Sequence, residues 1–148
     1  MFQNATGHAR VNVMLVSEDG KRRRVHRSSA FNMDDDPDCD LELDVHAGVS
    51  GEAFTNKRPV VGDLTVPSAV GMPSWRLDAA ENARVRRTLK SILSVPVFDP
   101  SDSDGAPLAT LQVDTDVELA ESGLAEEHTR EVVERFADVV SFLLDVRR

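Results

Sequence analysis

Residues 91–114 read SILSVPVFDPSDSDGAPLATLQVD, and this stretch indicates the fold of the whole chain. It contains two β-rich runs, Ile92–Phe98 and Leu108–Val113, joined by a segment of Asp, Ser, Pro and Gly residues. Valine, isoleucine, leucine and phenylalanine favour pleated strands, whereas the residues of the joining segment favour turns. The stretch therefore predicts an antiparallel hairpin at the middle of a sheet, with its tip in solvent.

The two predicted strands differ in how apolar and polar side chains alternate. In the second strand, Leu111 and Val113 share one face. The other face carries the polar residues Thr110, Gln112 and Asp114. This alternation is typical of a half-buried strand. The first strand is apolar on both faces toward its end, which indicates that it is covered on both sides.

Composition restricts the class of protein. A chain of 148 residues with 41% hydrophobic residues predicts one soluble domain, residues 1–148, in which residues 1–9 match the end of an opening helix. The net charge of −9 argues against nucleic acid as a partner. The sequence has neither a membrane-length apolar run nor a signal-peptide pattern, so we expect no membrane segment within the chain and a cytoplasmic location. Its single cysteine, Cys39, cannot form an internal disulfide.

The N-terminal third predicts a second hairpin. Val11–Val16 alternates as a strand, and Asp19-Gly20 is a tight-turn signal. The return strand, about Arg22–Ser29, is strongly basic and has two interpretations: a phosphate or nucleic-acid patch, or an exposed edge strand protected by charge. No aromatic residue interleaves the basic ones as nucleic-acid platforms require, so the edge strand is favoured. Leu41–Val45 predicts a further short strand.

The middle of the chain predicts a short helix, a strand, a loop and a second helix. Ser50 is the expected N-cap of the first helix, which Pro59 stops. Residues 60–64 predict a strand, residues 65–77 a long loop, and residues 79–90 a helix.

The last predicted element is a long amphipathic helix that opens at Ser122 or Gly123 and covers about residues 122–147. Its apolar residues fall at heptad-type spacing, with neighbours that widen the stripe: Ala125, Val132, Val133, Phe136, Val139, Val140, Leu143, Leu144 and Val146. A stripe of this width either packs entirely on the core or also meets a partner helix. The sequence leaves both interpretations open.

In this order, the elements resemble the GAF domain family. The motifs that carry the resemblance are GVSGEAF at 48–54, RPVVGDL at 58–64, SILSVPVF at 91–98 and PLATLQVD at 107–114, followed by the closing helix. The resemblance covers nearly all of residues 10–147. It implies a PAS-like α+β fold with a central antiparallel sheet of five or six strands, helices on one face and a small-molecule pocket on the other. Members are mostly sensory or regulatory modules, often homodimeric through their terminal helices.

The sequence lacks the signatures of several subtypes of this family. The cyclic-nucleotide motif is absent from 114–118, and residues 78–90 hold no cysteine for a bilin. Free methionine sulfoxide reductases of this fold need several cysteines, because a sulfenic acid requires a resolving thiol. The four histidines are scattered, and no metal cluster or nucleophile–base pair can be assembled. We therefore expect no enzyme activity and no metal, and the sequence identifies no cofactor.

Two hypotheses follow. In the first, the domain is a non-catalytic sensor that binds a small ligand between the sheet and segment 60–89, and transmits its state through the terminal helices to a signalling output. Position suggests Asp63, Trp75, Arg76 and Arg84 as ligand-binding residues, since an indole offers a flat apolar surface and guanidinium groups hold an anion or carbonyl. Packing on the core and exposure to solvent are the alternative roles of these side chains. In the second hypothesis, a degenerate GAF domain serves as a ligand-free dimerisation or docking module.

Overall fold

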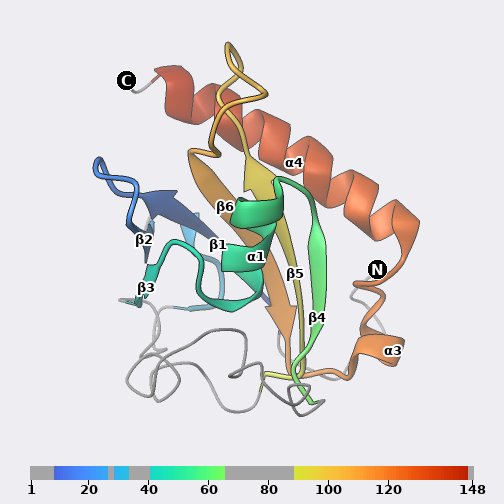
Figure 1. Cartoon of the computed structure of the whole chain (residues 1–148). Helices are drawn as coiled ribbons and strands as arrows, with labels where there is room; N and C mark the ends of the chain where they lie inside the picture. The colour runs from blue at the N-terminus through green and yellow to red at the C-terminus, as the bar shows by residue number, and fades with distance from the viewer. Residues whose placement is uncertain (1–8, 27–28, 34–40, 66–88, 147–148) are drawn as a thin grey trace.

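A computed structural model describes residues 9–26, 29–33, 41–65 and 89–146 of the chain. Within these ranges the strands form one antiparallel six-stranded sheet in the order β3-β2-β1-β6-β5-β4 (Figure 1). The predicted central hairpin is confirmed, since β5 and β6 pair in register and β6 also pairs with β1. The strands are β1 Ala9–Val16, β2 Arg22–Val25, β3 Glu42–Asp44, β4 Val60–Asp63, β5 Ser91–Val97 and β6 Ala109–Thr115.

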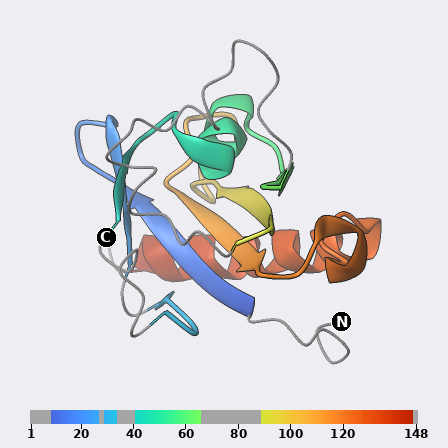
Figure 2. The same cartoon turned by 90° about the horizontal axis from the view of Figure 1, so that it is seen from below.

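The sheet is covered on both faces. Helix α4 (Glu127–Val146) packs on one face against β5 and β6, and α1 (Gly48–Asn56) packs on the other (Figure 2). On the α4 side, Val133 and Ala137 join the inward apolar residues of β1, β5 and β6 in the main core. The predicted α+β architecture of a central antiparallel sheet with a long C-terminal helix is therefore confirmed.

Strand β6 is more deeply buried than its sequence pattern predicted. All seven of its residues are buried, including the polar face that was expected to be wet. The reason is tertiary, because α4 covers one face of the strand while α1 covers the other. The polar residues of β6 thus lie inside the protein, where they need partners.

The basic strand β2 is not the edge of the sheet, so this prediction was wrong. Strand β3 pairs outside it, and Glu42 lies between two of the arginines, 3.3 Å from Arg22 Nε and 3.4 Å from Arg24 Nη2. The middle arginine, Arg23, has an exposed fraction of 0%. The Asp-Gly turn before β2 is confirmed, with Gly20 in the left-handed region at φ 72°.

Two helix starts differ from the predictions. The residue preceding α1 is Ala47, while Ser50 lies buried in the first turn; the helix ends at Lys57 (φ 55°), just before Pro59. The last helix does not open at 122, because a short helix, α3 (Leu119–Ser122), ends there at Gly123, whose φ of 77° is typical of a helix C-terminus. No helix in the described part of the chain has the length and apolarity needed to cross a membrane.

Candidate ligand-binding pocket

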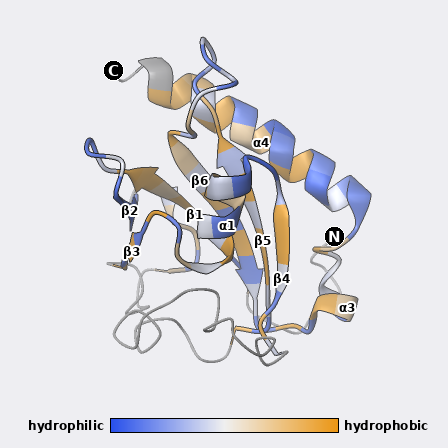
Figure 3. Cartoon of the chain, in the orientation of Figure 1, coloured by the Kyte–Doolittle hydropathy of each residue, from blue (hydrophilic) through white to orange (hydrophobic). Residues whose placement is uncertain are grey.

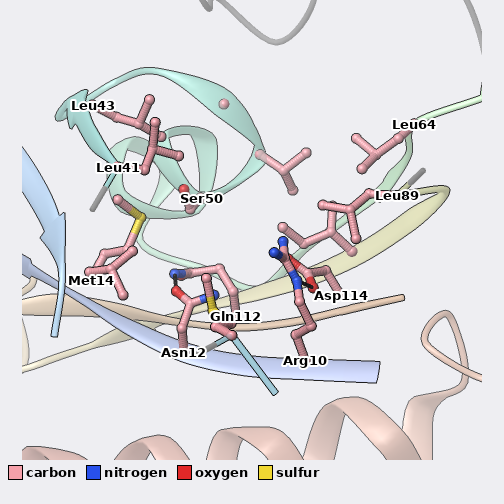
Figure 4. A pocket seen from close by; sticks show the side chains of 15 residues that line it. Arg10, Asn12, Met14, Leu41, Leu43, Ser50, Leu64, Leu89, Gln112 and Asp114 are labelled. Atoms are coloured by element: carbon pink, nitrogen blue, oxygen red, sulfur yellow. Dashed lines mark hydrogen bonds and ion pairs between the residues drawn. The ribbon is translucent and has the colours of Figure 1, made fainter. Parts of the chain in front are cut away.

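A cavity of about 100 Å³ lies on the face of the sheet that carries α1 (Figure 4). Its floor comes from β1, β5 and β6, and its walls come from β2, β3, the start of α1 and the residues flanking 66–88. The described residues that line it are Arg10, Asn12, Met14, Val25, Met33, Leu41, Leu43, Gly48, Val49, Ser50, Leu64, Leu89, Ile92, Gln112 and Asp114.

Strand register produces the polar floor. Across β1 and β6, Arg10 is paired with Asp114 and Asn12 with Gln112. Side chains of a strand alternate between faces, so the residues between these positions point to α4 and form the apolar core there. One sheet therefore separates an apolar core under α4 from a partly polar pocket under α1.

Arg10 and Asp114 form a buried two-point ion pair. Arg10 donates from Nε to Asp114 Oδ1 at 2.8 Å and from Nη2 to Oδ2 at 3.0 Å. The exposed fractions of the two side chains are 2% and 4%. Parallel N–H···O bonds of this kind fix the orientation of both groups, and each charge compensates the other where water is excluded.

The second floor pair is uncharged and incompletely satisfied. Gln112 donates from Nε2 to Asn12 Oδ1 at 2.8 Å, while Gln112 Oε1 is buried without a hydrogen-bond partner in the described structure. Ser94 stands directly opposite Gln112 across β5 and β6, and its buried hydroxyl also lacks a partner there. Buried polar groups without partners are rare and costly, so Gln112 leaves the floor with unused hydrogen-bonding capacity.

Arg23 holds the wall of the pocket in place. Its guanidinium donates from Nε to the carbonyl oxygen of Val45 at 3.1 Å and from Nη2 to that of Ala47 at 2.6 Å. Nη1 donates to the hydroxyls of Ser50 and Thr110. These bonds connect β2 to the turn before α1, which presents Val49 and Ser50 to the cavity.

The residues suggested from sequence have different places. Asp63 ends β4, next to the pocket residue Leu64, and its Oδ1 accepts hydrogen bonds from the backbone and hydroxyl of Thr65 at 2.9 and 2.6 Å. It is not among the described residues that line the cavity. Trp75, Arg76 and Arg84 lie outside the described residues, as do the predicted 65–77 loop from residue 66 onward and nearly all of the 79–90 helix. The ligand-binding role of all four residues stays a prediction.

Sequence reasoning did not select the polar floor. A usable signal was present, because Arg10 and Asn12 alternate on one strand and Gln112 and Asp114 on another. Polar residues at alternate positions of central strands become a site only when the sheet order brings the two strands together. The described residues contain no group of three or more His, Cys, Asp or Glu side chains suited to a metal ion.

Comparison with known proteins supports the fold. No protein-family model and no curated protein matches the sequence. Residues 122–287 of a methyl-accepting chemotaxis protein superimpose with a TM-score of 0.67 and 20% identity, over 99% of this chain and 82% of that one. The GAF domain of the Acinetobacter phosphoenolpyruvate-protein phosphotransferase gives 0.62 and 13%, over 92% and 70%.

An enzyme is also among the similar structures. The free methionine-R-sulfoxide reductase of Neisseria meningitidis, solved with its substrate, gives a TM-score of 0.62 and 20% identity, over 89% of this chain and 64% of that one. At these identities the similarity defines the fold. The chain is a GAF-like α+β domain, as the sequence motifs indicated.

Proposed function

We propose that this domain is a non-catalytic sensory or regulatory module that binds a small molecule in the cavity between the sheet and α1. The observation that carries the proposal is the cavity with its built polar floor, in which Gln112 retains an acceptor without a partner among the described residues. Ligand pockets combine an apolar lining with a few placed polar groups, and this cavity has both.

The proposal favours a sensor over an enzyme because of the chain's thiol content. The reductases of similar fold are named for their activity on free methionine-R-sulfoxide. Recycling a sulfenic acid through a protein disulfide needs a second thiol, and Cys39 is the only cysteine here. A domain whose single cysteine cannot form an internal disulfide also suits the cytoplasm.

The sheet itself provides a route from the pocket to α4. Gln112 faces the cavity, while its neighbours Leu111 and Val113 pack in the core with Val133 and Ala137 of α4. A ligand that binds one arrangement of β6 more tightly than another favours the position of α4 that belongs to that arrangement. The shift in this equilibrium is limited by the difference between the two binding free energies. Helix α4 would pass that change to a signalling output.

Native mass spectrometry of the purified protein tests this function. We expect an additional non-covalent mass that is lost on denaturation. Val49→Phe fills the cavity and removes this mass, whereas the same change at the exposed Val139 leaves it. Purified protein with no added mass, and with no rise in melting temperature across a metabolite panel, contradicts the proposal, because a ligand that binds only the folded state must stabilise it.

A second candidate function, which a separate observation favours, is homodimerisation through α4. Four large apolar residues of this helix are more than half exposed: Phe136 (62%), Val139 (56%), Phe142 (63%) and Leu143 (55%). They share the side of α4 away from the core residues Val133 and Ala137. The ribbon of α4 carries both hydrophilic and hydrophobic residues along its length (Figure 3). Exposed apolar patches of this kind mark interaction surfaces.

Sedimentation at tens of micromolar distinguishes the two candidates. We expect a dimer that Phe136→Glu/Phe142→Glu converts to a folded monomer, with Arg135→Glu on the same helix as the matched charge-changing control. A wild-type monomer at that concentration contradicts dimerisation and leaves ligand binding to be judged by the mass measurement.

A further inference from the structure

We infer that the pocket selects an uncharged, mainly apolar ligand and rejects anions and cations of the same size. This inference rests on the proposed function, and it names the chemical class of molecule that the cavity takes. It differs from the expectation that arginines hold an anionic group, and it follows from how the charges and apolar side chains of the pocket are arranged.

The two charged residues in the described part of the lining compensate each other. Arg10 and Asp114 are the only charged residues among the described residues that line the cavity, and two hydrogen bonds join them. An anionic ligand would have to compete with Asp114 for Arg10, and a cationic ligand would have to compete with Arg10 for Asp114. Either ion also loses its hydration on entry, and the described part of the lining offers no further charged group that would repay this loss.

Most of the remaining lining is apolar and adaptable. The apolar residues are Met14, Val25, Met33, Leu41, Leu43, Val49, Leu64, Leu89 and Ile92. Methionine side chains adjust to irregular shapes, so two of them allow the wall to fit a small hydrocarbon group. The volume of about 100 Å³ is below the roughly 150 Å³ of a cavity that binds benzene, so a branched aliphatic chain fits directly and an aromatic ring fits when these side chains adjust.

The uncharged floor pair determines which polar groups of a ligand the cavity can bind. Asn12 and Gln112 are amides, and the buried Gln112 Oε1 is an acceptor without a partner among the described residues. A hydroxyl or amide N–H on the ligand satisfies this acceptor once the side chain turns it toward the cavity, without bringing a charge into the cavity. The class is therefore a small neutral molecule with an apolar body and at most a few polar atoms.

The chain contains a single isoleucine, Ile92, and this residue lines the pocket. Labelling isoleucine δ1 methyl groups with ¹³C therefore gives one NMR signal that reports on the cavity. We would titrate the full chain with three probes of similar size: toluene, benzoate and benzylammonium. We expect toluene to move the Ile92 signal saturably and to bind at least about tenfold more tightly than either ion, because only the ions lose hydration without compensation.

Breaking the ion pair provides the sharpest check. Asp114→Asn removes one negative charge from the cavity, so benzoate affinity should rise about tenfold or more while toluene affinity changes little. Asp138→Asn, at an exposed position of α4, is the matched control and should alter neither affinity. If Asp114→Asn does not fold, the variant Arg10→Met/Asp114→Leu removes both charges, and it should still bind toluene and still exclude benzoate.

Three results would overturn the inference. They are benzoate or benzylammonium binding wild-type protein as tightly as toluene, an Ile92 signal that none of the probes moves, and loss of toluene binding in the folded double variant. The first would leave the proposed function intact and correct only the ligand class. The second would overturn the inference alone if native mass spectrometry still shows a retained small molecule, and would count against both if it does not.

Discussion

Arg23 of β2 donates from Nη2 to the carbonyl oxygen of Ala47 at 2.6 Å, and this bond connects the sheet to the start of α1. The same guanidinium also bonds to the carbonyl oxygens of Asp44 and Val45. A planar group with several donors can satisfy neighbouring carbonyls of one turn at once. A residue that looks like part of a surface charge cluster is in fact the internal support of the pocket wall.

Replacing Arg23 with lysine should lower the free energy of unfolding by about 2–4 kcal/mol, because one ammonium cannot reach all of these acceptors and those that remain are buried. The measurement is urea unfolding. Arg24→Lys in the same strand is the matched control: its side chain is 71% exposed, and we expect a change within about 0.5 kcal/mol. Equal effects at the two positions would contradict the supporting role of Arg23.

Gly51 permits the close approach of α1 to the turn that precedes it. A Cβ atom placed there would lie 2.2 Å from the backbone carbon of His46 and 2.4 Å from its carbonyl oxygen. Gly51→Ala should therefore force the turn away from the helix and cost about 3 kcal/mol in thermal or urea unfolding.

Gly20→Ala separates this steric effect from the general cost of losing a glycine. Gly20 has φ 72° and nothing within 4 Å of the added Cβ, so only backbone strain of about 1 kcal/mol is expected. A Gly51→Ala variant as stable as Gly20→Ala would show that the approach to His46 is not a constraint.

Ser94→Ala should raise the free energy of unfolding by about 1 kcal/mol, because the change removes a buried hydroxyl that has no partner in the described structure. Ser122→Ala is the matched control, because Ser122 is also buried but its hydroxyl makes hydrogen bonds. Ser122 Oγ donates to Leu119 and accepts from the Leu124 amide at 2.9 and 3.1 Å, so its loss should cost about 1 kcal/mol. Changes of the same sign would mean that Ser94 has a hydrogen-bond partner after all, such as a bound water.

The hydrogen bonds of Asp19 in the turn before β2 make the stability of this turn depend on pH. Asp19 Oδ1 accepts hydrogen bonds from the Ser17 hydroxyl at 2.6 Å and the Lys21 amide at 3.0 Å, and these bonds lower the pKa of Asp19 below 3.8. The bonded carboxylate therefore stabilises the turn above the unfolded-state pKa, and this contribution is lost as the pH falls through the folded-state pKa. An NMR titration should show the low pKa, and Ser17→Ala should raise it. An unchanged pKa in that variant would contradict the role of the hydroxyl.

Local patterns predicted the elements whose conformation depends on neighbouring residues. The runs that became β5 and β6, the Asp19-Gly20 turn and strand β4 followed from β propensity, alternation and turn chemistry. The closing helix was predicted to be long and amphipathic, but its predicted start was wrong. A glycine such as Gly123 is compatible both with the N-terminus of one helix and with the C-terminus of the helix before it. Its left-handed φ, which only the structure shows, identifies it as the C-cap residue of α3.

The sequence by itself determined the central hairpin and the long closing helix, because hydrophobic periodicity and turn chemistry act over a few residues. The order of its motifs also showed the resemblance to a GAF-like sheet. The tertiary structure alone decided the site. Residues Arg10 and Asp114 are 104 positions apart, and only the pairing of β1 with β6 makes them neighbours. In the same way, burial turned Arg23 from an apparent surface charge into a buried support, since the placement of β3 outside β2 depends on contacts that no local pattern encodes.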